Sequence, residues 1–239
     1  MATPQLSRTP PASPKKAFRV AEHKFLFLFL YTLGVLVYYP YVKEGTPSYF
    51  LFRLAGSAGI LLALYAINLR RTLMMCAVLL AVPALLQRLL LPQIDGGRFA
   101  VLMIALSLAF DVFVIVIIFR RVFSQVRPDA EGVAGGLCIY LLVGFGFASI
   151  YGIMNTVQPK AFYLDPATNL HSVASRFDLV YYSFATMTSV GASGITAVTE
   201  EVRSIAIVEA TLGVLYIAVL IARLITAYRS PSTASSDDV

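Results

Sequence analysis

Stretches of mostly apolar residues, separated by short polar segments, recur along this chain. A stretch of about twenty such residues is long enough to cross the hydrocarbon core of a bilayer as a helix. Six spans are predicted on this basis: Phe25–Val42, Tyr49–Ile67, Thr72–Leu91, Phe99–Phe119, Val133–Met154 and Arg203–Tyr228. A further segment, Phe177–Thr188, is amphipathic and too short to cross. The pattern therefore predicts an all-α integral membrane protein with six transmembrane helices.

Composition favours a lipid environment over a soluble one. The chain is 58% hydrophobic and 13% charged, and a soluble domain has too little interior to bury that much apolar surface. The net charge of +6 comes from basic residues beside the spans, which is typical of orientation signals and does not indicate nucleic-acid binding. Cys76 and Cys138 lie inside apolar spans and form neither a disulfide framework nor a metal-ligand spacing.

The distribution of lysine and arginine predicts how the protein is inserted. Basic residues are more frequent on the side that would hold both termini, and this side of a membrane protein is usually the cytoplasm. An even number of spans agrees with two termini on one side. We therefore expect a multi-pass protein of the cell membrane with both termini cytoplasmic and the short segment 177–188 in the outer half of the bilayer.

Residues 177–228 have the order short helix, polar strand, long helix. A non-helical backbone at membrane depth must be buried in protein or line a water-filled cavity. The simplest arrangement is a re-entrant pore helix and filter loop between the fifth and sixth spans. The C-terminal end of the short helix would carry partial negative charge, which favours a cation. The following strand would offer carbonyl oxygens to a dehydrated ion, and four copies around an axis would close the path.

The loop has a family resemblance. The run from Thr186 to Thr199 reads TMTSVGASGITAVT, and it resembles the tetrameric potassium-channel pore loop, T-x-T-T-V-G-Y-G-D-I-T-P, without a gap. Phe177–Phe184 is similar to the pore helix of that family, and Gly213–Arg223 is similar to its inner helix. The resemblance covers about the last hundred residues, from the fifth span onward.

The resemblance implies an ion filter at Thr188, Ser189, Val190, Gly191, Ala192 and Ser193. Ser189 takes the threonine position at the inner mouth, where its hydroxyl still supplies an oxygen. Val190 and Gly191 match outright. Gly213 falls where the family often has its inner-helix hinge; a small residue for helix packing is the alternative.

Three positions depart from the family pattern. Ala192 replaces the tyrosine whose ring braces the filter, Ser193 replaces the second glycine, and Gly194 replaces the aspartate above it. A positive φ at Ser193 would cost about 1 kcal/mol or more in each subunit. Without the tyrosine, we expect a looser outer filter and a weakened preference for potassium.

Glu209 lies within the sixth span, which makes it an intramembrane acid candidate. A carboxyl group at that depth is a functional hypothesis by default. Two interpretations stay open. One is a functional role, behind the filter, toward the cavity or paired with a group of the pore helix, and the other is a structural hydrogen bond near the outer interface.

The chain divides into four regions on these grounds. Residues 1–20 are predicted to be a disordered cytoplasmic tail, 21–127 a four-helix transmembrane unit, 128–229 the pore module and 230–239 a second cytoplasmic tail. The fourth span lacks the regular basic residues of a voltage sensor, and Asp111 has the opposite charge.

The predicted function is a passive cation channel that carries K⁺ or Na⁺ with weakened selectivity. It requires no cofactor and no bound metal, and its expected partners are the lipid bilayer and three further copies of itself. Catalytic constellations and phosphate-binding glycine loops are not visible in the sequence, so an enzyme is not expected. One alternative is a non-conducting channel homologue that acts as a regulatory or sensing subunit. A secondary transporter would need inverted repeats with a second interrupted segment.

Overall fold

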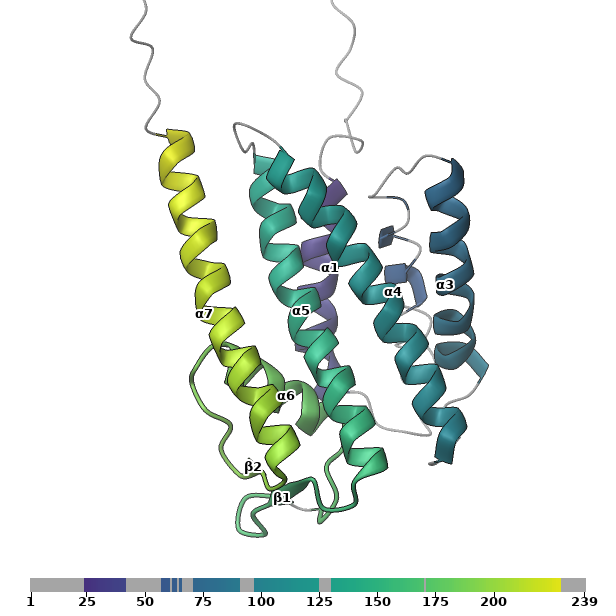
Figure 1. Ribbon diagram of the computed structural model, residues 1–239, viewed down its shortest axis with the longest axis vertical. Helices are drawn as coiled ribbons and strands as arrows, with labels where there is room; N and C mark the ends of the chain where they lie inside the picture. Colours follow the sequence, from purple (N-terminus) through teal and green to yellow (C-terminus); the bar gives the residue numbers. More distant parts are fainter. Residues whose placement is uncertain are drawn as a thin grey trace, which may run out of the picture.

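The computed structural model describes residues 24–41, 57–60, 62–63, 65, 71–90, 97–124, 130–169 and 171–228. Most of these residues are helical (Figure 1). The elements are α1 (Lys24–Tyr38), the 3₁₀ turn η2 (Tyr39–Tyr41), α3 (Arg71–Leu90), α4 (Gly97–Ser124), α5 (Ala130–Val157), β1 (Phe162–Leu164), α6 (Arg176–Met187), β2 (Ile195–Ala197) and α7 (Glu200–Tyr228).

Four helices of the described residues are long and apolar enough to cross a membrane. They cover Lys24–Tyr41, Arg98–Ser124, Glu131–Val157 and Glu200–Ile225. These correspond to the first, fourth, fifth and sixth predicted spans. Helix α3 stands where the third was expected, but its longest apolar helical stretch is the shorter Leu73–Leu85. The second predicted span, Tyr49–Ile67, and the two predicted tails, 1–20 and 230–239, lie mostly or wholly outside the described residues.

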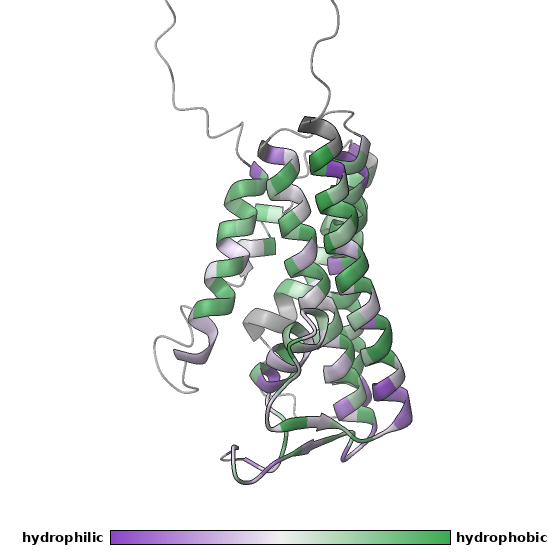
Figure 2. Cartoon of the chain, turned by 90° about the vertical axis from the view of Figure 1, so that its left-hand side faces the viewer, coloured by the Kyte–Doolittle hydropathy of each residue, from purple (hydrophilic) through white to green (hydrophobic). Residues whose placement is uncertain are grey.

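The surface of the helices has the polarity of a membrane protein. Figure 2 shows hydrophobic residues along most of the length of the helices, with hydrophilic residues gathered toward the two ends of the bundle. Large apolar side chains are exposed on the outward faces, among them Leu79 at 73% and Ile207 at 68%. In water such a surface would be unstable, so it must contact lipid or other copies of the chain.

Helix α5 is the central element of the described fold. It packs against α1 and α4 on one side and against α6 and α7 on the other (Figure 1). The main core lies where α1, α4 and α5 meet and includes Phe25, Ile118 and Cys138, each at most 5% exposed. This core fixes α5, and α5 in turn provides the wall on which α6 rests.

A two-stranded antiparallel sheet joins the segments on either side of α6. Phe162 of β1 pairs with Ala197 of β2, and Leu164 pairs with Ile195. The buried rings of Tyr151, Phe162 and Tyr182 meet edge to face beneath this sheet, with centroids 5.1–5.7 Å apart. The sheet therefore holds the start and the end of the α6 hairpin together at one end of the bundle. Each strand has three residues, too few for an alternating pattern to predict them.

Candidate functional site

Helix α6 has the position expected for the short segment 177–188. Ser175 and Asp178 form a capping box at its start: the Asp178 amide donates to Ser175 Oγ at 3.2 Å, and the Ser175 amide donates to Asp178 Oδ2 at 2.8 Å. This reciprocal pair satisfies two backbone donors and defines the first turn. The helix then runs for twelve residues and ends at Met187, too short to cross a bilayer.

The C-terminal end of α6 lies level with the middle of the two long helices beside it. Ser183 Oγ donates a hydrogen bond of 2.7 Å to the carbonyl oxygen of Gly144, near the midpoint of α5. A Cβ atom at Gly213, near the midpoint of α7, would overlap the Met187 carbonyl oxygen. The loop after Met187 therefore starts about halfway along α5 and α7, and Figure 1 shows α6 between those helices.

The residues after α6 fold back on the helix end. The Ser189 amide donates to the Thr186 carbonyl at 3.0 Å, and the Val190 amide donates to the Ala185 carbonyl at 3.0 Å. Ser189 has a φ of 59°. This pair of bonds around a left-handed residue is a Schellman cap, in which glycine is the usual residue. The expected strand at residues 188–194 is thus a series of turns, and the strand β2 begins only at Ile195.

The cap leaves the opposite side of the loop backbone unpaired. The Gly191 amide also bonds the Ala185 carbonyl, at 3.1 Å. Among the described residues, no group donates a hydrogen bond to the carbonyl oxygens of residues 188–191. Residues 188–191 are exposed in the single chain, so their backbone oxygens are accessible. These oxygens are therefore available to a ligand that is not part of this chain.

The outer half of the loop is held from both sides. The Ser193 amide donates to Tyr181 Oη of α6 at 3.1 Å. The Gly194 carbonyl oxygen accepts from the Asp165 amide at 2.9 Å and from Asn169 Nδ2 at 2.7 Å. Ala192 packs against the aromatic cluster that contains Tyr182. The loop therefore has fixed anchors although it lacks the family tyrosine.

The positive φ considered for Ser193 in the sequence is found at other residues of the loop. Within the described loop, positive φ angles are found at Ser189, Gly191 and Gly194, with φ values of 59°, 83° and 80°. Ser193 does not have one, so the strain expected there is instead at Ser189. The reason is the Schellman cap, which requires its left-handed residue directly after the C-cap residue, here Thr188.

Glu209 is fully buried on α7 and faces α5 and α6. Its Oε1 atom is 2.5 Å from Ser183 Oγ, and its Oε2 atom accepts from Tyr151 Oη at 2.6 Å. The carboxyl group therefore lies between α7 and the buried sides of α5 and α6. The sequence suggested a partner on the segment 177–188 but did not identify Ser183 or Tyr151, because they lie on two other helices, 26 and 58 residues away.

The inner end of α7 is tied to α4. Arg223 Nη2 donates to the Val122 carbonyl oxygen at 2.5 Å, and its guanidinium lies 4.5 Å from the centre of the Phe123 ring. Tyr216 Oη donates to the Gly136 carbonyl of α5 at 2.6 Å. These two contacts hold the half of α7 that extends beyond α6.

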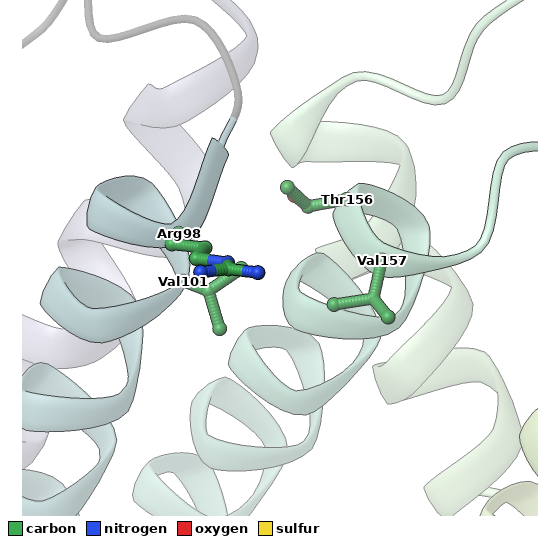
Figure 3. Close-up of a pocket in the computed structure, with 4 residues that line it drawn as sticks. All are labelled: Arg98, Val101, Thr156 and Val157. Atoms are coloured by element: carbon green, nitrogen blue, oxygen red, sulfur yellow. The ribbon is translucent and has the colours of Figure 1, made fainter.

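A cavity of about 330 Å³ lies elsewhere, between the first turn of α4 and the last turn of α5. Figure 3 shows Arg98 and Val101 on one side of it and Thr156 and Val157 on the other. None of the predicted site residues lines it.

Comparison with known families agrees with this arrangement. Residues 136–230, from α5 through α6 to the end of α7, match the family described as Ion channel. This part of the chain is therefore similar to the pore region of ion channels. The matched segment starts within α5, close to the predicted start of the pore module at residue 128. No curated protein and no solved structure matches the chain.

Proposed function

We propose that the chain is a passive cation channel whose path runs along the loop at residues 188–193. The observation that carries this proposal is the set of unpaired carbonyl oxygens at residues 188–191, placed at the C-terminal end of a helix that stops halfway along two membrane-spanning helices. Carbonyl oxygens at that depth need a partner, and a partly dehydrated cation is one. The negative end of the α6 dipole favours the same ligand.

Four copies around a shared axis complete the path in this proposal. One chain supplies a single wall, and its Val190 side chain is 81% exposed at the loop. An apolar side chain in that position is better accommodated against neighbouring loops than in water. The exposed apolar residues of α7, such as Leu215 at 55%, would face lipid or the adjacent copy.

The membrane arrangement belongs to the same proposal. Six spans, the re-entrant α6 hairpin in the outer half and cytoplasmic termini together explain the apolar surface and the basic residues at its borders. Helices α4 and α7 end, and α5 begins, at the end of the bundle away from the sheet (Figure 1). With cytoplasmic termini, the sheet and the mouth of the loop would therefore lie on the outside.

Selectivity is proposed to be weak. Ala192 brings no ring to the position where the related pore loop has tyrosine, and Ser193 is held by a single hydroxyl, that of Tyr181. The inner oxygens at Ser189 and Val190 would still bind potassium, while the outer half would adjust to sodium. No cofactor or resident metal is needed, since the ions are cargo.

Ion flux from liposomes tests the proposal. Purified protein is reconstituted in vesicles loaded in turn with potassium, sodium and a large organic cation, and release is followed after dilution. We expect potassium and sodium to leave and the organic cation to stay. A reversal potential that follows potassium alone would contradict the loosened filter.

The same assay separates the rival function. A non-conducting homologue that serves as a regulatory or sensing subunit would release neither ion although it inserts as a tetramer. Cross-linking of the reconstituted protein therefore accompanies the flux. A monomer in the bilayer would contradict the shared pore.

A further inference from the structure

The contacts around Glu209 form a chain of oxygen atoms across three helices. From α5, Tyr151 Oη lies 2.6 Å from Glu209 Oε2. On the other side, Glu209 Oε1 lies 2.5 Å from Ser183 Oγ of α6. Ser183 Oγ in turn lies 2.7 Å from the Gly144 carbonyl oxygen, again on α5. The Tyr151, Ser183 and Glu209 side chains are all at 0% exposure, so water does not complete their hydrogen bonding.

The number of hydrogen atoms available to these oxygen atoms decides the protonation state of Glu209. Each of the three oxygen–oxygen contacts needs one hydrogen atom between its members. Tyr151 and Ser183 supply one each, and the Gly144 carbonyl supplies none. Ser183 therefore cannot donate both to Gly144 and to an ionised Glu209. With an ionised carboxylate, one contact would bring two oxygen atoms together without a hydrogen, which is repulsive at these distances.

We infer that Glu209 is protonated in the folded protein and donates its own hydrogen to Ser183 Oγ. Ser183 then donates its hydroxyl hydrogen bond to the Gly144 carbonyl oxygen, and Tyr151 donates to the second carboxyl oxygen of Glu209. Every donor and acceptor is satisfied in this arrangement, and no charge is buried among apolar helices. Glu209 is thus a neutral positioning residue that joins α7 to the pore helix α6 and, through Ser183 and Tyr151, to α5.

The surroundings of Glu209 fit a neutral acid. The titratable groups that face it are tyrosines: Tyr140 and Tyr151 from α5 and Tyr182 from α6. A tyrosine is neutral at physiological pH, so none of these neighbours supplies a countercharge for a carboxylate. The nearest basic residue on its own helix toward the sheet is Arg203, whose Nε donates to the Ala197 carbonyl at 3.0 Å.

The inference bears on the pore through α6 but does not depend on conduction. The loop at residues 188–193 continues directly from α6, so the height of α6 sets the height of the carbonyl oxygens. A hydrogen donated by Glu209 fixes Ser183, one turn before the end of α6. Within the proposed channel, this contact holds the filter loop in place.

Infrared difference spectroscopy tests the protonation state without any measurement of ion flux. Spectra of the wild-type protein and of Glu209→Gln are recorded in lipid at neutral pH. We expect the variant to lose one carbonyl-stretch band of a carboxylic acid. Glu201→Gln, on the exposed first turn of the same helix, is the matched control and should leave that band in place. A variant spectrum that lacks only carboxylate bands would overturn the inference.

A second pair of measurements covers the direction of the hydrogen bond and its role. In Ser183→Ala the acid loses its acceptor, so its band should shift to the higher frequency of a free acid; an unshifted band would overturn the assigned donor.

Glutamine can donate its amide hydrogen to Ser183 and accept from Tyr151, whereas aspartate is one methylene too short. We therefore expect Glu209→Gln to retain the wild-type ratio of potassium to sodium release and Glu209→Asp to lose it. The reverse order would contradict the positioning role.

Discussion

The backbone amide of Ser193 donates a hydrogen bond to the hydroxyl of Tyr181, 3.1 Å away. Tyr181 lies in the middle of α6, and Ser193 lies in the loop that follows this helix and folds back beside it. In the related pore loops, a tyrosine of the filter itself provides the brace, at the position of Ala192. Here the aromatic ring belongs to α6 and reaches across to the loop. If the proposed filter forms, this hydrogen bond would brace it from the helix in place of the missing tyrosine.

Replacing Tyr181 by phenylalanine removes the hydroxyl and keeps the ring. A single neutral hydrogen bond contributes about 1 kcal/mol, and Tyr181 is 41% exposed, so we expect the thermal stability to change little. The loop should become looser, and the ratio of potassium to sodium flux should fall. Tyr163→Phe in β1, at 55% exposure, is the control. An unchanged ratio in Tyr181→Phe would show that the outer loop does not line the path.

Restoring the family residues at positions 192 and 193 should raise selectivity for potassium, whereas restoring the third, at position 194, should lower stability. Ala192 packs against the cluster that contains Tyr182, so a tyrosine at 192 would point toward the pore helix. We expect Ala192→Tyr with Ser193→Gly to increase the preference for potassium in the liposome assay. Adding Gly194→Asp should lower the melting temperature, because Gly194 has a φ of 80° and a Cβ there would overlap Thr168 Oγ1. The left-handed backbone alone costs a residue with a Cβ about 1–2 kcal/mol. A triple variant as stable as the double one would contradict this packing.

Two helical glycines form a matched pair for the packing of the inner helix. A Cβ at Gly213 would overlap the Met187 carbonyl oxygen, whereas nothing lies within 4 Å of a Cβ at Gly152. We expect Gly213→Ala to destabilise the protein by about 1–3 kcal/mol, as overpacking does. Gly152→Ala should stabilise it by about 0.5–1 kcal/mol, through the better helix propensity of alanine. Thermal unfolding in detergent measures both.

The role of Gly213 as a hinge stays a separate prediction. A hinge would alter conduction even where the helix remains packed. If Gly213→Ala keeps its melting temperature but changes flux, the hinge explains the glycine better than packing does.

Most helices were predictable from the sequence because apolar length is a strong signal. The predicted fifth span, Val133–Met154, lies inside α5, and the predicted segment 177–188 differs from α6 by one residue at each end. The third predicted span, Thr72–Leu91, was too long in its apolar part, since Gln87 and Arg88 follow the apolar stretch Leu73–Leu85 of α3. The three-residue strands had no periodicity to reveal them.

In the candidate site, too, local sequence patterns were predictable, whereas contacts between distant residues were not. The predicted filter residues follow one another in the sequence, so the loop at residues 188–193 could be proposed as a filter from its pattern alone. Tyr181, Tyr151 and Ser183 become important only through contacts made by the tertiary fold. The capping box of Ser175 and Asp178 was visible as a serine followed three residues later by an acid, and would have fixed the start of α6. The left-handed conformation of Ser189 could not be foreseen, because serine does not signal it.

The inner half of α7 gives the last prediction. Arg223 binds the Val122 carbonyl, in the last turn of α4, and stacks on Phe123. The last carbonyls of a helix have no partner within the helix and carry partial negative charge, which suits a guanidinium. A hydrogen bond to a charged group contributes about 1.5–3 kcal/mol, so Arg223→Gln should lower stability by a comparable amount. Arg223→Lys should recover only part of it, because an ammonium lacks the planar face that stacks on the ring. Arg120→Gln, on the exposed side of the same turn region of α4, is the control and should change stability little. Melting temperatures in detergent decide between these outcomes, and a lysine variant as stable as the wild type would show that charge alone holds α7 to α4.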